Sequence, residues 1–400
     1  MSKAKVMEWV QKYTMILALI LVVAFFAVQT GGKILYPQNI TNLIAQNGYV
    51  FILSVGMLFC ILTGGNIDLA VGSVVCFVGA VGATLMVGGM NVVLAVIVML
   101  LIGTVIGAWQ GFWIAYVRIP AFIVTLAGML VFRGLSNVVL GGMTLSINKF
   151  ETFIMVFGGG ASCYFPDLIG GGPTVLVNGS EVVLNMFSIV VGIVLIVGYL
   201  GFAACSYISN SKKGYANAPI AAVAGKAIIV VGVIGYFFWK FAQYKGVPTV
   251  LAWIGAIVVI YTFISSKTTL GRHFYAVGGN EKATKLSGIN TDRIYFIGYT
   301  NMGLLCALAG MLTIARMVSA QPTYGDGYEL DAIGACYIGG ASAYGGVGTV
   351  PGVIIGALLM GVINLGMSIM GVDANYQKVV KGLVLLAAVV FDVVSKRKKA

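Results

Sequence analysis

Long uninterrupted apolar runs constrain this chain more than any other feature of its sequence. Several of them reach about 18 residues, the length at which a helix crosses the hydrocarbon core of a bilayer. Lipid offers no hydrogen-bond partner to free backbone groups, so segments that cross it one at a time must be helical. We therefore predict an all-α fold: a polytopic transmembrane helical bundle that forms a single domain over residues 1–400.

The composition agrees with a membrane protein and argues against a nucleic-acid partner. Hydrophobic residues make up 60% of the chain and charged residues only 9%, whereas soluble domains have about 25% charged residues. The 55 glycines suit close contact between helices in lipid. A net charge of +12 would suggest nucleic-acid binding in a soluble protein. Here, a bias of lysine and arginine toward cytoplasmic loops explains it better.

We predict about twelve spans, with both termini in the cytoplasm. The seventh carries Lys226 and Lys240 near its two ends, where both side chains can reach the headgroups. It is retained because, without it, the basic loop at 271–290 or the basic C-terminus would fall on the outer side. The predicted spans are approximately 14–28, 40–62, 73–86, 92–116, 120–140, 182–204, 219–241, 249–264, 295–317, 330–344, 350–370 and 376–394.

Basic residues orient these spans. Lys3, Lys5 and Lys12 precede the first span, which lacks a small-residue cleavage site and is interpreted as an uncleaved anchor. The segment 141–181 contains Lys149 as its only lysine or arginine. We therefore predict that 141–181 is an extracytoplasmic loop.

The longest polar interval in the second half of the chain is Gly271–Asn290, which we predict to be a cytoplasmic loop. Asn280 can cap a helix that follows it, Glu281 suits the positive start of that helix, and Gly288 offers a left-handed stop. The pattern predicts one short helix of about two turns. A short capped helix without an apolar face to bury must dock on something else, unless it is an ordinary solvated loop.

The chain carries no recognisable catalytic, metal-binding or nucleotide-binding pattern. Gly225-Lys226-Ala227 lacks the spacing of a phosphate-binding loop, and His273 is the only histidine. The six cysteines contain no C-x-x-C pair, so neither a structural zinc site nor a disulfide framework is expected. We therefore predict no cofactor and no metal, and a membrane enzyme is a weak alternative.

A few polar residues near or within the apolar runs are candidates to line a solute pathway. Asp68 follows Asn66 at a Gly-Gly corner, where it would act either as a helix cap or first-turn acid or as a pathway group. Asp331 has the same two interpretations. The amides of Asn137 and Asn364 could bind a hydroxylated solute or bridge two helices.

Two glycine-rich corners resemble one another. Gly64-Gly65 is followed after a short gap by Val71-Gly72-Ser73-Val74, and Gly339-Gly340 by Val347-Gly348-Thr349-Val350. Each lies where one predicted span ends and the next begins. Transporters often contain internal repeats with broken helices that face the pathway, although glycine-rich corners can also resemble one another by chance.

Four motifs, in matching order and spacing, resemble the permease subunits of bacterial ABC importers for monosaccharides, the ribose, xylose and multiple-sugar group. The similarity extends over nearly the whole chain, and the added material at 206–247 resembles the xylose and multiple-sugar branch. The motifs are GGNIDLAVGSVV (Gly64–Val75), IPAFIVTLAG (Ile119–Gly128), GRHFYAVGGNEKATKLSGI (Gly271–Ile289) and DAIGACYIGGASAYGGVGTVPG (Asp331–Gly352).

This resemblance implies a bundle of the vitamin B12 permease type (type II) in the bacterial inner membrane. It implies three partners: a cytoplasmic ABC ATPase subunit, an extracytoplasmic sugar-binding protein and a second permease chain, expected as a homodimer. It also implies that 271–290 is the coupling loop, which docks on the ATPase. The residues that match the coupling motif are Asn280, Glu281, Ala283, Gly288 and Ile289.

Two other transport functions remain open from the sequence. A secondary sugar transporter would need a buried carboxylate or cation site to use a proton or sodium gradient. ABC importers for branched-chain amino acids or nucleosides share the general architecture. The ligand of the partner binding protein would distinguish these from a sugar importer.

Overall fold

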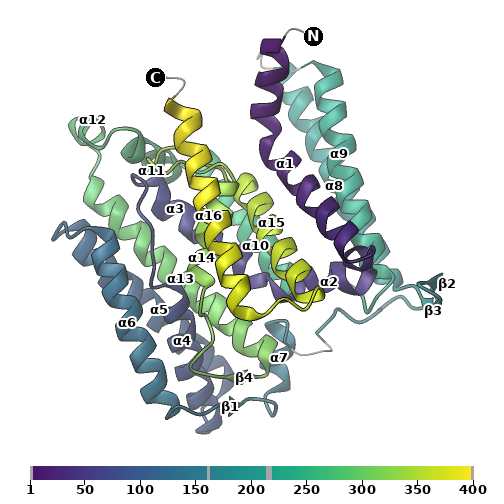
Figure 1. The fold of residues 1–400 in the computed structure, drawn as a ribbon, viewed down its shortest axis with the longest axis horizontal. Helices are drawn as coiled ribbons and strands as arrows, with labels where there is room; N and C mark the ends of the chain where they lie inside the picture. Colours follow the sequence, from purple (N-terminus) through teal and green to yellow (C-terminus); the bar gives the residue numbers. More distant parts are fainter. Residues whose placement is uncertain (1–2, 160–162, 213–218, 398–400) are drawn as a thin grey trace.

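The computed structural model describes residues 3–159, 163–212 and 219–397, and most of its helices run along a common axis (Figure 1). Within these residues, seven helices are long and apolar enough to cross a membrane, or eight if the bent pair α2 and α3 counts as one span. The prediction of an all-α polytopic bundle is confirmed. The count of about twelve spans is not confirmed.

The helices and the four short strands follow one another along the chain. Their bounds are α1 (Lys3–Gln29), the 3-10 helix η1 (Lys33–Leu35), α2 (Pro37–Gln46), α3 (Gly48–Leu62), α4 (Val71–Val87), α5 (Val92–Ala115), α6 (Ala121–Leu140), β1 (Leu145–Ser146), α7 (Glu151–Val156), β2 (Thr174–Val177), β3 (Ser180–Val183), α8 (Met186–Lys212), α9 (Ile220–Ala242), α10 (Val250–Lys267), α11 (Thr269–Gly279), α12 (Glu281–Leu286), α13 (Thr291–Met317), β4 (Ser319–Ala320), α14 (Tyr328–Ile338), α15 (Val350–Ile369) and α16 (Ala374–Arg397).

Helix α13 forms the centre of the bundle and packs on α3, α4 and α5. Glycines allow the closest of these approaches: a Cβ atom on Gly107 of α5 would lie 2.9 Å from the Cα atom of Gly303 on α13. Side chains are therefore absent where these two helices cross. Such small-residue contacts replace the hydrophobic effect as the source of helix association in lipid.

One predicted span is wrong. The segment 330–344 forms only α14 of eleven residues, which is about 16 Å long and shorter than the hydrocarbon core of about 30 Å. The helix ends at Ile338 because Gly340 adopts φ 83° and the chain then turns repeatedly, with Gly345 and Gly346 also at positive φ. The break at 339–349 contains no charged residue, so hydropathy alone did not reveal it.

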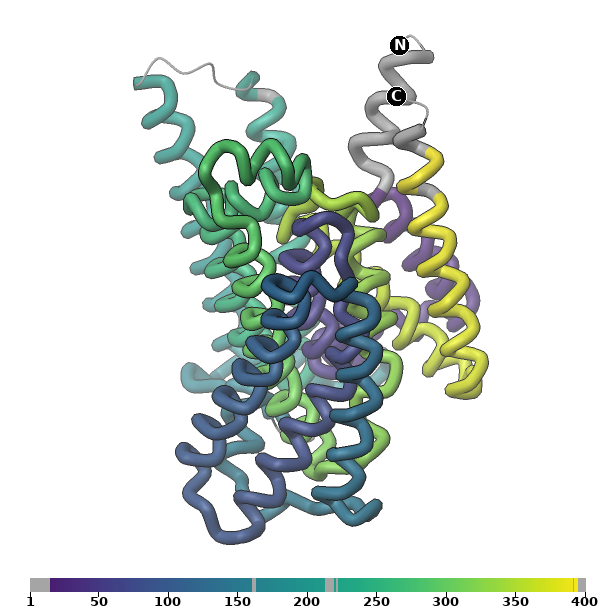
Figure 2. Tube along the Cα trace, turned by 90° about the vertical axis from the view of Figure 1, so that its left-hand side faces the viewer, coloured from purple at the N-terminus to yellow at the C-terminus, as the bar shows by residue number. Residues whose placement is uncertain are grey.

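Helices α8 and α9 pack against each other at the edge of the molecule (Figure 2), and α9 also contacts α2. Only 11% of the most apolar window of α8 and 6% of that of α9 is buried within the chain. The segment predicted as span seven, 219–241, is helical, and its residues 222–242 are long and apolar enough to cross a membrane. This pair of helices is therefore an apolar addition to the rim of the bundle.

The two ends of the bundle differ in structure. Helices α11 and α12 lie at the end toward which the start of α1 and the end of α16 point (Figures 1 and 2). The opposite end carries the strands: β1 pairs with β4, and β2 pairs with β3 (Figure 1). Most of 141–181, including β1, α7 and β2, thus lies at the end away from α12.

Candidate functional site

The loop at 271–290 contains two helices rather than the single short helix that we predicted. Helix α12 has the expected form: the Asn280 side chain accepts a hydrogen bond from the Ala283 N–H at 3.0 Å, and Gly288 has φ 86°. The preceding residues belong to α11, whose start is capped by Thr268 and which buries Phe274 and other residues of one face. The sequence analysis missed α11 because this short helix contains three glycines and is interrupted by Arg272 and His273.

Glu281 points inward from α12 and holds this helix to the rest of the protein. Its carboxylate lies 2.7 Å from Nη1 of Arg118 and accepts hydrogen bonds from the hydroxyls of Tyr295 at 3.1 Å and Thr291 at 3.3 Å. Arg118 also pairs with Asp292 and therefore joins the α5–α6 corner to α12 and α13 at once. Partial burial alone would raise the pKa of Glu281, but the hydrogen bonds from Arg118 and Tyr295 outweigh it and lower the pKa.

Arg118 was missed as a functional residue in the sequence analysis. Its backbone has φ 64°, in the left-handed region that residues other than glycine seldom adopt. The conformation turns the side chain back from the corner toward α12. A basic residue directly before Ile-Pro in a chain with few charges was the signal available in the sequence.

The opposite side of α12 faces solvent and is apolar and basic. Leu286 is 90% exposed, the largest exposure among the exposed large hydrophobic side chains. Lys282 and Lys285 are exposed beside it, as is Ala283. Ile289 is half-buried and packs on the core. Among the candidates from the sequence, Glu281 and Ile289 thus attach the loop, whereas Ala283 belongs to its outer surface.

A second polar cluster lies inside the bundle, where α14, α15 and α16 meet the bend between α2 and α3. Asp331, in the first turn of α14, is fully buried. Lys381 of α16 lies 3.0 Å from it, and the Tyr49 hydroxyl donates to it at 2.6 Å. The Asn364 amide donates to Asn47 at 3.2 Å and reaches Asp331 at 3.5 Å. Of the five pathway candidates, only Asp331 and Asn364 are brought together here.

The other three pathway candidates lie apart from this cluster. Asn66 donates to the carbonyl oxygen of Thr63 within its own turn, at 3.2 Å. Asp68 is buried, lies three residues before the first residue of α4, and accepts a hydrogen bond from the Ala70 N–H at 2.8 Å. The interpretation of Asp68 as the N-cap or a first-turn acid of that helix is therefore wrong. Asn137 is exposed on α6.

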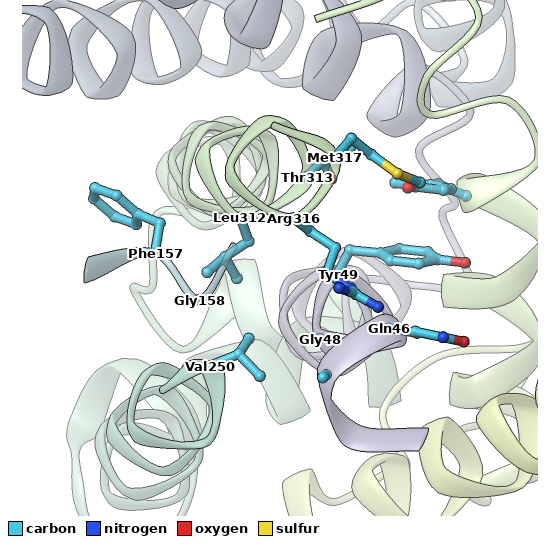
Figure 3. Close-up of a pocket in the computed structure, with 12 residues that line it drawn as sticks. Gln46, Gly48, Tyr49, Phe157, Gly158, Val250, Leu312, Thr313, Arg316 and Met317 are labelled. Atoms are coloured by element: carbon cyan, nitrogen blue, oxygen red, sulfur yellow. The ribbon is translucent and has the colours of Figure 1, made fainter. Parts of the chain in front are cut away.

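A small cavity adjoins the cluster at Tyr49. It has a volume of about 30 Å³, which is enough for roughly one water molecule and too small for a monosaccharide. Gln46, Tyr49 and Arg316 line one side, and Phe157 and Val250 line the other (Figure 3). The Tyr49 ring stacks on Tyr328 with centroids 3.5 Å apart, and both rings line the cavity. The hydroxyl of Tyr49 binds Asp331, so this tyrosine lies between the cavity and Asp331.

The comparison with protein-family models gives one match, at residues 39–389. The model describes the permease component of branched-chain amino acid transport systems. The chain belongs to this family. Its members are non-catalytic membrane subunits of transporters, and the apolar helices of this chain agree with a multi-pass membrane protein.

Curated relatives match the chain over nearly its full length. It is 37% identical to the xylose transport system permease protein XylH of Escherichia coli K12, over 97% of this chain and 93% of the relative. The XylH protein of Haemophilus influenzae is 36% identical, with 97% of both chains covered. The ribose import permease protein RbsC of E. coli K12 is 33% identical, over 96% of this chain and 94% of the relative. No solved structure matches the chain.

Proposed function

We propose that this chain is the membrane-spanning permease subunit of an ATP-driven importer that passes monosaccharides of the xylose and ribose type into the cytoplasm. The observation that carries the proposal is the similarity, over nearly the whole length, to permeases named for xylose and ribose transport. The family model is named for branched-chain amino acids and covers a wider group. The nearly full-length relatives therefore favour a sugar over an amino acid.

ATP hydrolysis then belongs to a separate cytoplasmic ATPase subunit, for which α12 is the docking helix. Leu286, exposed and flanked by Lys282 and Lys285, supports this role because an apolar side chain at a helix tip gains by burial against a partner. Glu281 and Arg118 would hold the helix rigidly to the α5–α6 corner. Asn280 and Gly288 would fix its start and end.

The remaining partners follow from the same assignment. An extracytoplasmic sugar-binding protein would deliver its ligand to the end that carries 141–181, and a second copy of the chain would complete the pathway. With α12 in the cytoplasm, both termini are cytoplasmic as well, since α1 begins and α16 ends toward the same end of the molecule (Figure 1). The membrane is then the bacterial inner membrane, and Asp331 and Asn364 are candidates to line the pathway near its centre.

The assignment of α12 can be tested by copurification in mild detergent. We compare Leu286→Asp with Leu176→Asp, an exposed leucine of β2 at the opposite end of the molecule. Leu286→Asp should reduce recovery of the ATPase subunit by at least about tenfold, since burying an unpaired carboxylate in the interface is unfavourable. Leu176→Asp should leave it unchanged. Full recovery of the ATPase with Leu286→Asp would contradict the docking role.

The transport function is tested by uptake of labelled xylose, ribose and leucine into cells or proteoliposomes. We expect sugar uptake that needs ATP and resists an uncoupler. Uptake that collapses with the proton gradient would instead indicate a secondary transporter, and uptake of leucine alone would indicate an amino-acid importer. Replacing 281–286 by a Gly-Ser segment should abolish uptake while the protein remains in the membrane.

A further inference from the structure

Three segments of backbone meet directly beneath the α11–α12 loop. The first follows α3 (Leu62–Gly65), the second lies in the break between α14 and α15 (Ala343–Gly348), and the third ends α11 (Tyr275–Gly279). We call this meeting point the glycine junction. It brings together the two glycine-rich corners that resemble one another in the sequence and adds the end of α11 to them.

Hydrogen bonds link these segments directly. The Gly346 N–H donates to the carbonyl oxygen of Leu62 at 3.1 Å, which ties the second break to the end of α3. The Tyr275 hydroxyl donates to the carbonyl oxygen of Gly348 at 2.9 Å, which ties α11 to the same break. A displacement of α11 therefore reaches the second break through one hydrogen bond and the end of α3 through the next.

Backbone contact leaves no room for a side chain between the segments. A Cβ atom on Gly346 would lie 2.8 Å from the amide nitrogen of Gly279 and 2.9 Å from the carbonyl carbon of Gly278. A Cβ atom on Gly278 would collide with the carbonyl oxygen of Leu62 and the amide nitrogen of Gly346. Backbone in contact with backbone cannot yield by rotating a side chain, so a displacement of one segment presses directly on the other two.

We propose that Gly278 and Gly346 are positioning residues of transport, which join the ATPase-docking loop to the two broken segments that precede α4 and α15. The inference rests on the proposed role of α12. Glu281 and Arg118 fix α12 to α13 and to the α5–α6 corner, and α11 carries its movement to the junction. The two breaks then shift together, and the inner ends of α4 and α15 shift with them.

Adjacent glycines of α11 provide a matched test. A Cβ atom on Gly279 meets no atom within 4 Å, whereas one on Gly278 collides with backbone. Helix propensity favours alanine at both positions by about 0.5 to 1 kcal/mol, so it cannot separate them. We would reconstitute the complete importer, with its ATPase and binding protein, and measure ATP hydrolysed and sugar imported for Gly278→Ala and Gly279→Ala.

We expect Gly278→Ala to keep the ATPase bound and active while sugar imported per ATP falls by about tenfold or more, in the range of measured coupling energies. Gly279→Ala should match the unaltered chain. Tyr275→Phe, which removes the hydroxyl that donates to Gly348 and keeps the ring, should lower the same ratio by about threefold without loss of the ATPase.

The outcomes separate this inference from the proposed function. Failure of the unaltered chain to bind an ATPase would count against the proposed function itself. An unchanged ratio of sugar to ATP in both Gly278→Ala and Tyr275→Phe would overturn the junction alone. Loss of the ATPase in Gly278→Ala would also overturn it, since the contact would then be needed to hold the loop in place rather than to transmit its movement.

Discussion

Replacing Lys381 by methionine should destabilise the protein strongly, because it leaves the Asp331 carboxylate buried without its cation. Asp331 is fully buried, and the side chain of Lys381 is only 15% exposed at a separation of 3.0 Å. Removing one partner of a buried pair costs about 3 to 5 kcal/mol. Asp331 retains the hydrogen bond from Tyr49, so we expect about 3 kcal/mol, toward the lower end.

The contacts of α16 make this pair important for holding the helix in place. Where the side chains of α16 are described, none of them is fully buried. The helix is attached through Lys378 to Asp326, through Lys381 to Asp331, and through Asp392 to the Ala343 N–H at 3.1 Å. Val384 and Leu385 pack on the core. Other apolar side chains of α16 are exposed on the opposite face, namely Tyr376, Val379, Leu383, Leu386 and Val390.

The loss of stability is measured as a fall in the melting temperature of the purified protein in detergent, with size-exclusion chromatography as the detection method. Lys378→Met is the matched control, because the Lys378–Asp326 pair is more than half exposed on both sides and pairs of this kind contribute about 0 to 1 kcal/mol. The double variant Lys381→Met with Asp331→Asn should recover most of the stability, since a neutral amide needs no cation.

Two results would refute this reasoning. If Lys381→Met and Lys378→Met lower the melting temperature equally, burial of Asp331 does not decide how much its ion pair contributes to stability. If the double variant is no more stable than Lys381→Met, the two residues do not act as a pair.

Three further predictions concern α12 and the centre of the bundle. Burial alone would raise the pKa of Glu281, but its hydrogen bonds lower this pKa below the ordinary value for a glutamate. The stabilisation that Glu281 provides is therefore complete above the ordinary pKa and is lost only as pH falls through the lowered pKa. Amide exchange in α12, corrected for intrinsic rates, should thus be the same at about pH 6 and pH 8. Asn280→Ala should weaken α12 by about 1 kcal/mol and speed exchange of its amides, whereas Asn280→Ser should not. Gly303→Leu should abolish folded yield by overpacking at α5, whereas Gly134→Leu, which meets open space, should not.

Local features of the fold were predictable because their causes lie within a few residues. The end of α12 needs only Gly288 at positive φ, and its start needs only an oxygen on Asn280 within reach of the Ala283 N–H. Apolar length likewise located most of the long helices. The prediction of a membrane span at 330–344 failed because hydropathy counts apolar residues. It does not register that the chain turns at Gly340 and again at Gly345 and Gly346.

The site could be predicted only in part. The residue types at 280–289 predicted the loop. They did not predict that Glu281 faces inward or that Leu286 is the exposed tip of the loop. Asp331 and Asn364 were candidates, whereas their partners Tyr49 and Lys381 were not. A lysine within the predicted span 376–394 was a signal that the sequence did contain, since such a charge is costly in lipid unless it is paired.

The sequence by itself determined that the chain is a helical membrane protein, because apolar length and unsatisfied backbone groups leave no other solution in lipid. Only the tertiary structure decided which polar groups meet. Arg118 and Glu281 are 163 positions apart, and Tyr49 and Asp331 are 282 positions apart. Their pairing depends on how α13 packs against α5 and α3, and on glycine backbones that approach without side chains between them; no local pattern encodes either.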